Sequence, residues 1–262
     1  MAKLLSKSGK WALYGDTDAQ IVVCGHSHAG SVLFAKLNGY ERDSSQADIS
    51  VCYTSDLNQG APGDKEYWNF VADLSHGKHV VIAWNGNQHN VDFMFQTDPK
   101  FTMLGVADDS YDHGAVVIPR AMIKNYFKPS FEELTEIIPS LSNAASITLM
   151  NGPAPKPLSH IQNCILQEKY FTDIAESRGV VVDDLVVASD SLRLGLWKLI
   201  SEMLESYAHA MGVHFLSTPL DSLDTSGLLL EKYWVADTTH ANESYGLLQM
   251  ERIIKCTEES QR

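Results

Sequence analysis

Two short segments near opposite ends of the chain carry the side chains that nucleophilic catalysis requires. Ser27 lies in the stretch 25–28, which reads Gly-His-Ser-His, and Asp237 and His240 stand three positions apart before the last predicted helix. A serine hydroxyl attacks a carbonyl when a histidine takes its proton, while a carboxylate on the other ring nitrogen fixes the tautomer of that histidine. Such triads occur in different chain orders on unrelated folds. These three residues are therefore candidates for a catalytic triad.

The elements predicted around Ser27 would present its hydroxyl to a ligand. Residues 21–24 form an apolar run that predicts a buried strand, a glycine at position 25 breaks it, and a helical pattern follows through residue 37. Open α/β sheets bind ligands at the carboxyl ends of their strands, and the unpaired N–H groups of a helix start favour negative charge there. A serine at this place can also simply cap the helix, so its position alone is compatible with either role.

The rest of the chain has the pattern of an α/β protein. Apolar runs predict five strands, at residues 21–24, 49–53, 79–84, 146–150 and 213–216. Helical patterns lie between and after them, at residues 66–74, 117–127, 130–140, 161–177, 192–211 and 241–254. This alternation predicts a parallel sheet covered on both faces, in a single domain over residues 1–262. We expect residues 1–19 to be a polar lead-in, and residues 91–116 to be an insertion or lid over the strand ends.

Two loops other than the one at Ser27 follow predicted parallel strands. Gly60 lies in the turn-rich loop after the second strand, and Asn87 follows the third strand in a Gly-Asn pair. Because parallel strands end at the same edge of a sheet, Ser27, Gly60 and Asn87 are expected to converge there.

Taken together, these segments resemble the blocks of the SGNH hydrolases, also called the GDSL family. The resemblance is carried by the serine after Gly25, by the loop glycine Gly60, by the pair at 86–87, and by Asp237-x-x-His240. It extends over nearly the whole chain and includes Asn242 and Gly246, which are common in that family.

The resemblance implies a fold and a set of roles. The fold would be a three-layer α/β/α sandwich with a five-stranded parallel sheet of the flavodoxin-like kind. Ser27 would be the nucleophile, His240 the base and Asp237 the orienting carboxylate. The N–H groups of Ser27 and Gly60 and the side-chain amide of Asn87 would bind the oxyanion.

Three histidines near these blocks depart from the family pattern or add to it. His26 and His28 stand where the family usually has Asp and Leu, and His89 follows Asn87 closely. These side chains either line a solvent-facing loop or shape the pocket for the acyl or leaving group.

The composition of the chain argues against some classes of binding partner and indicates a cellular compartment. A formal net charge of −13 argues against binding to a nucleic-acid backbone or to an anionic membrane surface. The cysteines are scattered without a C-x-x-C spacing, which indicates free thiols in a reducing compartment. No secretory signal is evident at the N-terminus, and we expect a cytoplasmic protein. A serine triad requires neither a metal nor an organic cofactor.

Two rival interpretations are weaker. The stretch 25–28 also resembles the Gly-His-x-His block of metallophosphoesterases, but in that family this block comes late among the metal ligands. The stretch 189–192, Ser-Asp-Ser-Leu, precedes a long helix and is expected to supply its cap. We therefore predict a serine ester hydrolase that acts on a small-molecule or carbohydrate ester. An acyltransferase and a non-catalytic binding protein are the alternatives, and the oligomeric state is left open.

Overall fold

The fold was taken from a computed structural model of the chain. The structure describes residues 3–5, 11–38, 48–54, 65–84, 92–106, 114–177, 179–181 and 184–260.

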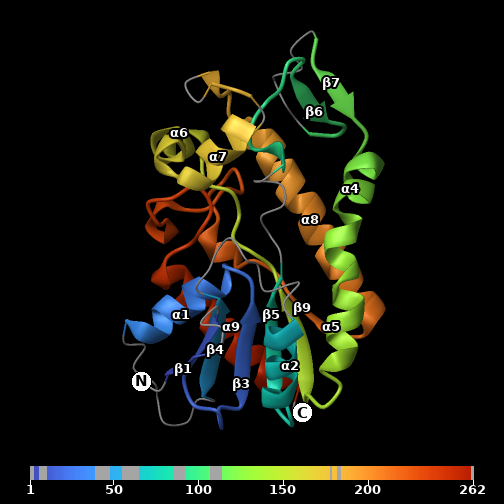
Figure 1. The fold of residues 1–262 in the computed structure, drawn as a ribbon, viewed down its shortest axis with the longest axis vertical. Helices are drawn as coiled ribbons and strands as arrows, with labels where there is room; N and C mark the ends of the chain where they lie inside the picture. Colours follow the sequence, from blue (N-terminus) through green and yellow to red (C-terminus); the bar gives the residue numbers. More distant parts are fainter. Residues whose placement is uncertain are drawn as a thin grey trace.

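A seven-stranded sheet forms the centre of the molecule (Figure 1), in the order β1-β2-β4-β3-β5-β8-β9. The five strands from β4 to β9 are mutually parallel, and numbered along the chain they follow the order 2-1-3-4-5 of the flavodoxin-like folds. The predicted parallel sheet is thus confirmed. The strands are β1 (Lys3–Leu5), β2 (Trp11–Tyr14), β3 (Ile21–Gly25), β4 (Ile49–Thr54), β5 (His79–Ala83), β8 (Ser146–Met150) and β9 (His214–Leu216).

The expected strand count of five was too low, because β1 and β2 extend the sheet beyond β4. Both strands are antiparallel to their neighbours and lie within the segment expected to be a polar lead-in. The side chains of Trp11 and Leu13 are almost fully buried. A four-residue apolar run inside a polar segment has too little periodicity to identify a strand, although burial against β4 is enough to stabilise it.

Helices cover both faces of the sheet and give the expected three layers. Alternate residues of β3 point to opposite faces: Ile21 and Val23 pack with α1 and α9, whereas Val22 and Cys24 pack with the side that contains α2, α4, α5 and α8. The helices are α1 (Ala29–Leu37), α2 (Lys65–Leu74), α4 (Arg120–Glu132), α5 (Leu134–Ser140), α6 (Leu158–Cys164), α7 (Lys169–Ser177), α8 (Asp190–Met211) and α9 (Glu243–Ser260). The described part of the chain contains no helix with the length and apolar character of a membrane span.

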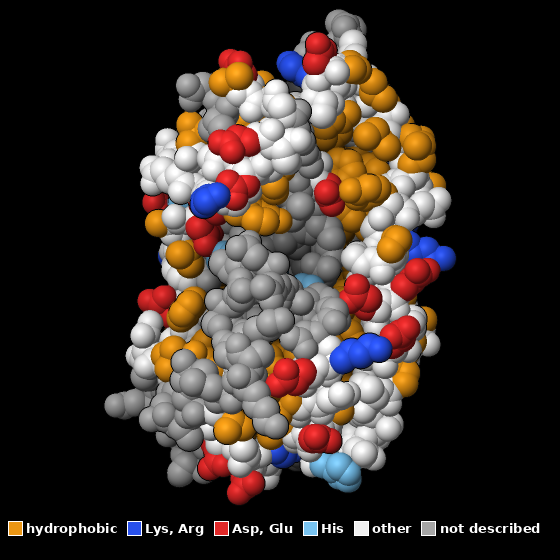
Figure 2. Space-filling model, in the orientation of Figure 1, with side chains coloured by type: hydrophobic (Ala, Val, Ile, Leu, Met, Phe, Trp, Pro, Cys, Tyr) orange, Lys and Arg blue, Asp and Glu red, His pale blue; other side chains and the backbone are white. Residues whose placement is uncertain are grey.

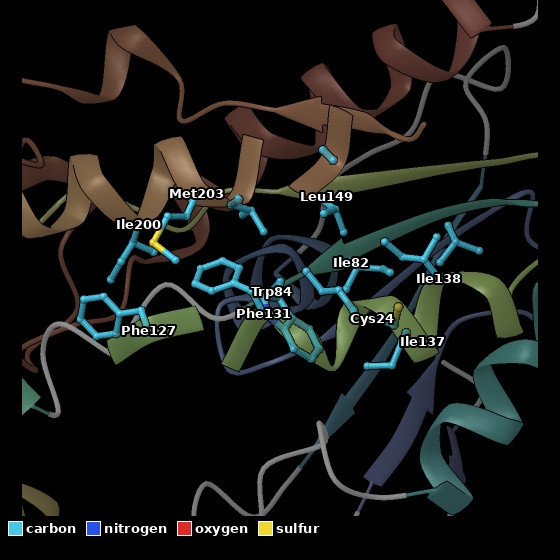
Figure 3. Close-up of a cluster of buried hydrophobic side chains, with 14 of the residues drawn as sticks. Cys24, Ile82, Trp84, Phe127, Phe131, Ile137, Ile138, Leu149, Ile200 and Met203 are labelled. Carbon is cyan, nitrogen blue, oxygen red and sulfur yellow. The ribbon is translucent and has the colours of Figure 1, made fainter. Parts of the chain in front are cut away.

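The largest hydrophobic cluster of the described residues lies between the sheet and α2, α4, α5 and α8 (Figure 3). Trp84, which directly follows β5, is fully buried there, and its indole N–H donates to the carbonyl oxygen of Ser130 at 3.1 Å. Phe127, Phe131 and Met203 pack into the same cluster. All four cysteines are free, as predicted. The fold therefore rests on apolar burial without a covalent cross-link.

Most helix boundaries differ from the prediction by a few residues, and α9 extends six residues beyond its predicted end; three differences have a structural cause. Residues 117–119 are not helical, because β7 (Val116–Ile118) pairs with β6 (Phe101–Met103) in a small separate sheet. Pro129 lies in the last turn of α4, and the break before α5 falls at Glu133. The predicted helix 161–177 is divided by a short 3₁₀ turn and by Glu168, whose side chain is engaged elsewhere.

Exposed apolar side chains gather on one face over β7 and α4 (Figure 2). They belong to Leu104, Val116, Val117, Met122 and Tyr126. Two of these residues lie in the segment 91–116, for which a lid or insertion remains a prediction.

Candidate active site

Gly25 creates the turn that separates β3 from Ser27. Its φ of +110° favours glycine, and a Cβ placed on it would lie 2.5 Å from the carbonyl oxygen of Ala83 in β5. Its N–H donates to the hydroxyl of Tyr67 at 2.7 Å, and that hydroxyl in turn donates to the carbonyl oxygen of Cys52 in β4 at 3.0 Å. Three adjacent strands therefore fix the point at which the chain leaves the sheet.

The Gly25→Ala variant is expected to lose stability from both backbone strain and a backbone clash. Positive φ at a non-glycine residue costs about 1–3 kcal/mol, and the clash with Ala83 adds to this. The measurement is urea unfolding beside a Gly105→Ala control, because Gly105 has a φ of +86° but nothing within 4 Å of its added Cβ. Equal losses in the two variants would show that the close approach to β5 contributes nothing.

The Ser27 side chain is not used as a helix cap. The N-cap residue of α1 is His28, and no side-chain capping hydrogen bond is found there. Among the described residues, no hydrogen bond to the Ser27 hydroxyl is found either. The contrast is Ser189, whose hydroxyl accepts from the N–H of Leu192 at 3.3 Å and caps α8 as predicted. Capping therefore accounts for a serine at the start of α8, whereas it does not account for Ser27 before α1.

Asp237 and His240 lie in a tight loop closed by an antiparallel bridge between Trp234 and Ala241. Oδ2 of Asp237 is 2.8 Å from Nδ1 of His240. Its Oδ1 accepts hydrogen bonds from the backbone N–H groups of Thr239 and His240, at 2.9 and 2.8 Å. The carboxylate thus holds the backbone of its own loop with one oxygen and the imidazole with the other.

The environment of Asp237 keeps its carboxyl ionised. Burial by itself raises the pKa of this group, but the hydrogen bond and charge of His240 and the charge of Lys156 outweigh burial and hold the pKa well below its usual range. Because an ionised carboxylate can only accept, Nδ1 of His240 is the donor and Nε2 of the neutral ring is the acceptor. This is the tautomer that a general base toward a hydroxyl requires.

Ser27 and His240 line the same pocket, which has a volume of about 240 Å³. The Nε2 atom of His240 is buried and has no hydrogen-bond partner among the described residues, and no direct hydrogen bond to Ser27 is formed. In unliganded sites such bonds are often long and tighten when substrate binds. Apolar atoms make up most of the pocket wall, from Phe34, Tyr53, Pro153, Val235 and Ala241 among others.

The two halves of this pocket are joined by contact between α1 and α9. A Cβ on Gly246 of α9 would lie only 1.9 Å from the carbonyl oxygen of Ser31 in α1, so the backbones touch at this point. Asn242 caps α9, because its Oδ1 accepts from the N–H groups of Ser244 and Tyr245 at 3.0 and 3.2 Å. The close approach and the cap together position His240 relative to the turn that carries Ser27.

The remaining predicted residues are distributed differently. His28 is buried and lines the pocket, with its ring centroid 5.7 Å from that of His240. His26 packs on Trp84 at 4.8 Å and is not among the residues lining this pocket. Gly60, Asn87 and His89 lie outside the described residues. Within the described ranges, no group of three or more His, Cys, Asp or Glu side chains is arranged to hold a metal.

Three residues that contact the Asp237 loop were not predicted from the sequence. Lys156 approaches the carboxylate of Asp237, His160 bonds to its carbonyl oxygen, and Glu168 accepts from Thr238. All three belong to the segment that follows β8. The one sequence signal for them is a lysine between two prolines, Pro155 and Pro157, in a loop at the carboxyl end of a predicted strand.

Comparison with known proteins gives similarity of structure alone. No family model matches the chain, and no curated protein matches it. It is similar to a proposed acylhydrolase from Bacteroides fragilis, with 13% identity, a TM-score of 0.47 and coverage of 94% of this chain and 90% of the other. A GDSL-like lipase from Bacteroides thetaiotaomicron shares 14% identity at a TM-score of 0.45, covering 92% and 88%. The periplasmic domain of a lipopolysaccharide acetyltransferase from Salmonella ser. Paratyphi A shares 12% at 0.45, covering 92% and 84%. At scores and identities this low, function has to be inferred from the geometry of the site.

Proposed function

We propose that this protein is a serine ester hydrolase in which Ser27, His240 and Asp237 act as a catalytic triad. One observation carries the proposal. Asp237 holds Nδ1 of His240 at 2.8 Å, while the buried Nε2, without a partner among the described residues, belongs to the pocket that Ser27 lines. A base whose tautomer is fixed and a serine without a capping role share one partly apolar pocket.

The proposed reaction begins when Nε2 of His240 takes the proton from the Ser27 hydroxyl and Oγ attacks the ester carbonyl. The imidazolium that forms is stabilised by the ionised carboxylate of Asp237. His240 then protonates the leaving alcohol, which leaves an acyl group on Oγ of Ser27. Water attacks this acyl-enzyme with His240 again as base, the acid departs, and Ser27 regains its proton.

Oxyanion binding in this proposal uses three donors. They are the backbone N–H of Ser27, the N–H of Gly60 and the side-chain amide of Asn87, of which the last two lie outside the described residues. Each donor of this kind contributes about a hundred- to a thousandfold to kcat. The substrate class we propose is a small-molecule or carbohydrate ester.

A fluorophosphonate probe tests the nucleophile directly. We expect the probe to add to one serine, with its mass found by mass spectrometry on the peptide that contains Ser27. The Ser27→Ala variant is expected to lose this label completely, because the nucleophilic oxygen is gone. Ser31→Ala is the matched control, because Ser31 lines the same pocket and its hydroxyl donates only to the carbonyl oxygen of His28, at 3.1 Å.

The outcomes separate the alternatives. Labelling of Ser27 with hydrolysis of p-nitrophenyl esters or acetylated sugars supports the hydrolase. Labelling together with turnover only when an alcohol or amine acceptor is added would indicate an acyltransferase. Absence of labelling in the folded wild-type protein would overturn the catalytic proposal and leave a binding protein.

A further inference from the structure

A buried lysine contacts the loop that carries Asp237 and His240. The side chain of Lys156 is 1% exposed. Its Nζ lies 3.0 Å from Oδ1 of Asp237, 2.6 Å from the carbonyl oxygen of Asp237 and 2.8 Å from that of Val235. A neutral amine donates only two hydrogen bonds, so three acceptors around one nitrogen indicate an ammonium ion.

The backbone of Lys156 is held in place by a second buried cation. Arg193 of α8 is fully buried, and it donates to the carbonyl oxygen of Lys156 at 2.8 Å and to that of Ala188 at 3.0 Å. Its guanidinium pairs with Asp190, whose Oδ1 also accepts from the N–H of Leu158 at 2.7 Å. The ammonium therefore extends from a backbone that α8 fixes on both sides.

Two other side chains of the same segment hold the loop at its backbone. Nε2 of His160 is 2.9 Å from the carbonyl oxygen of Asp237. Glu168 accepts from the N–H of Thr238 at 2.7 Å and from its hydroxyl at 3.2 Å. These contacts would hold the loop without Lys156, so that the lysine is not the loop's only support.

We propose that Lys156 is a positioning residue that offsets the charge of Asp237 and thereby keeps His240 unprotonated, and so available as a base, in mildly acidic solution. The proposal rests on the proposed function, in which His240 takes the proton of Ser27. It is drawn from the contact at 3.0 Å between the ammonium and the carboxylate oxygen that does not hold the imidazole.

The physical reason is the sum of charges close to the imidazole. An isolated carboxylate favours the protonated ring of a neighbouring histidine, because opposite charges attract. A cation on the other oxygen of that carboxylate cancels much of this attraction. Burial lowers the pKa of the Lys156 ammonium, and the charge and hydrogen bond of Asp237 offset only part of this effect. The three acceptors around Nζ indicate that the proton is nevertheless retained.

The other titratable groups near this pair bear on the same balance. On the loop is Asp237 itself, on the segment after β8 are Lys156, His160 and Glu168, and on the turn before α1 is His28. Lys156 and Glu168 carry opposite charges toward the loop. Removal of the positive charge of Lys156 is therefore expected to make protonation of His240 easier. Removal of the negative charge of Glu168 is expected to make it harder.

The main test is the pH dependence of kcat/KM for Lys156→Met. The substitution removes the cation and leaves a chain of similar length, so a proton binds His240 more readily. The acidic limb of the profile is expected to move up by about 0.5–1 pH unit. A purely structural role would lower the plateau and leave the limb in place.

Two variants serve as controls. Lys156→Arg keeps the positive charge and is expected to keep the limb of the wild-type protein, even if its larger head lowers the plateau. Lys169→Met removes a cation from the same segment, but this side chain is 85% exposed and pairs with Asp173, so neither limb nor plateau should change.

If Lys156→Met does not fold, a variant with the opposite expected shift and an NMR measurement still test the proposal. Glu168→Gln retains an acceptor for the N–H of Thr238 and removes a negative charge, so it is expected to move the limb down. The ring-proton NMR titration of His240, assigned with a His240→Gln sample, should move in the same directions without any need for turnover. An unmoved limb and ring titration in Lys156→Met, or a Glu168→Gln shift upward, would overturn the inference.

The two proposals can fail separately. If the His240 ring titration moves but the probe does not label Ser27, the hydrolase proposal fails and the charge balance stands. If Ser27 is labelled and neither the limb nor the ring titration moves, the hydrolase proposal stands and the role of Lys156 is rejected.

Discussion

His240→Ala is expected to lower kcat/KM for an ester by at least about 10⁴-fold while the protein remains folded. The variant removes the atom that takes the proton of Ser27 in the proposed reaction, and with it the imidazole that Asp237 holds in the pocket. Steady-state kinetics beside a thermal unfolding curve is the measurement, because it separates loss of chemistry from loss of fold.

Asp237→Asn provides the matched comparison. Asparagine keeps the size of the side chain, but its amide cannot fix the donor at Nδ1 as a carboxylate does, and a loss of about 10³–10⁴-fold is expected. Because His240 and Asp237 act as a unit in the proposed triad, the double variant should be hardly worse than His240→Ala alone. Losses that multiply in the double variant, or a His240→Ala variant with near-normal kcat, would contradict the triad.

The second large effect is expected from Gly246→Ala. The added methyl group would lie 1.9 Å from the carbonyl oxygen of Ser31, and a backbone atom cannot yield as a side chain can. α9 must therefore move away from α1, which should cost about 2–4 kcal/mol in spite of the higher helix propensity of alanine. Displacement of His240 from Ser27 by about 1 Å should lower kcat about a hundredfold as well.

Gly195→Ala is the control for this variant. Gly195 lies inside α8, and its added Cβ would meet the ends of the Val106 and Met103 side chains at 2.6 and 3.1 Å. The Met103 methyl group can turn aside, whereas the stiff, buried Val106 side chain must shift, so a stability loss of about 1–2 kcal/mol is expected; kcat should be unchanged because neither side chain lines the pocket of Ser27. Urea unfolding and ester kinetics on both variants decide the matter, and equal effects would show that the contact between α1 and α9 does not position the site.

The parallel core could be predicted from the sequence because a strand buried on both faces is apolar along its whole length. The run at 79–84 is an example, and β5 occupies residues 79–83 of it. The edge strands β1 and β2 could not be identified, since each is only three or four residues long and depends on its neighbour for burial. The periodicity of apolar residues identifies a long helix or strand. It does not identify a short strand that is stable only through its contacts in the tertiary fold.

The residues of the candidate site likewise divide into those that the sequence could indicate and those that it could not. Ser27, Asp237 and His240 could be named as candidates because their residue types and chain positions are themselves informative, and the structure brings the three to one pocket. Lys156 and Glu168 were missed, because a lysine and a glutamate in a loop usually lie in solvent, and nothing local shows that these two contact Asp237 and Thr238.

The two ends of the triad are separated by more than two hundred residues, and this spacing has a consequence during synthesis. At about 5–20 residues per second, the proposed nucleophile leaves the ribosome tens of seconds before its base. In the proposed mechanism, a nascent or truncated polypeptide that stops short of residue 240 would carry the serine without its base. In that mechanism, chemistry would begin only when α9 docks on α1, so the growing chain would not acylate itself before that contact forms.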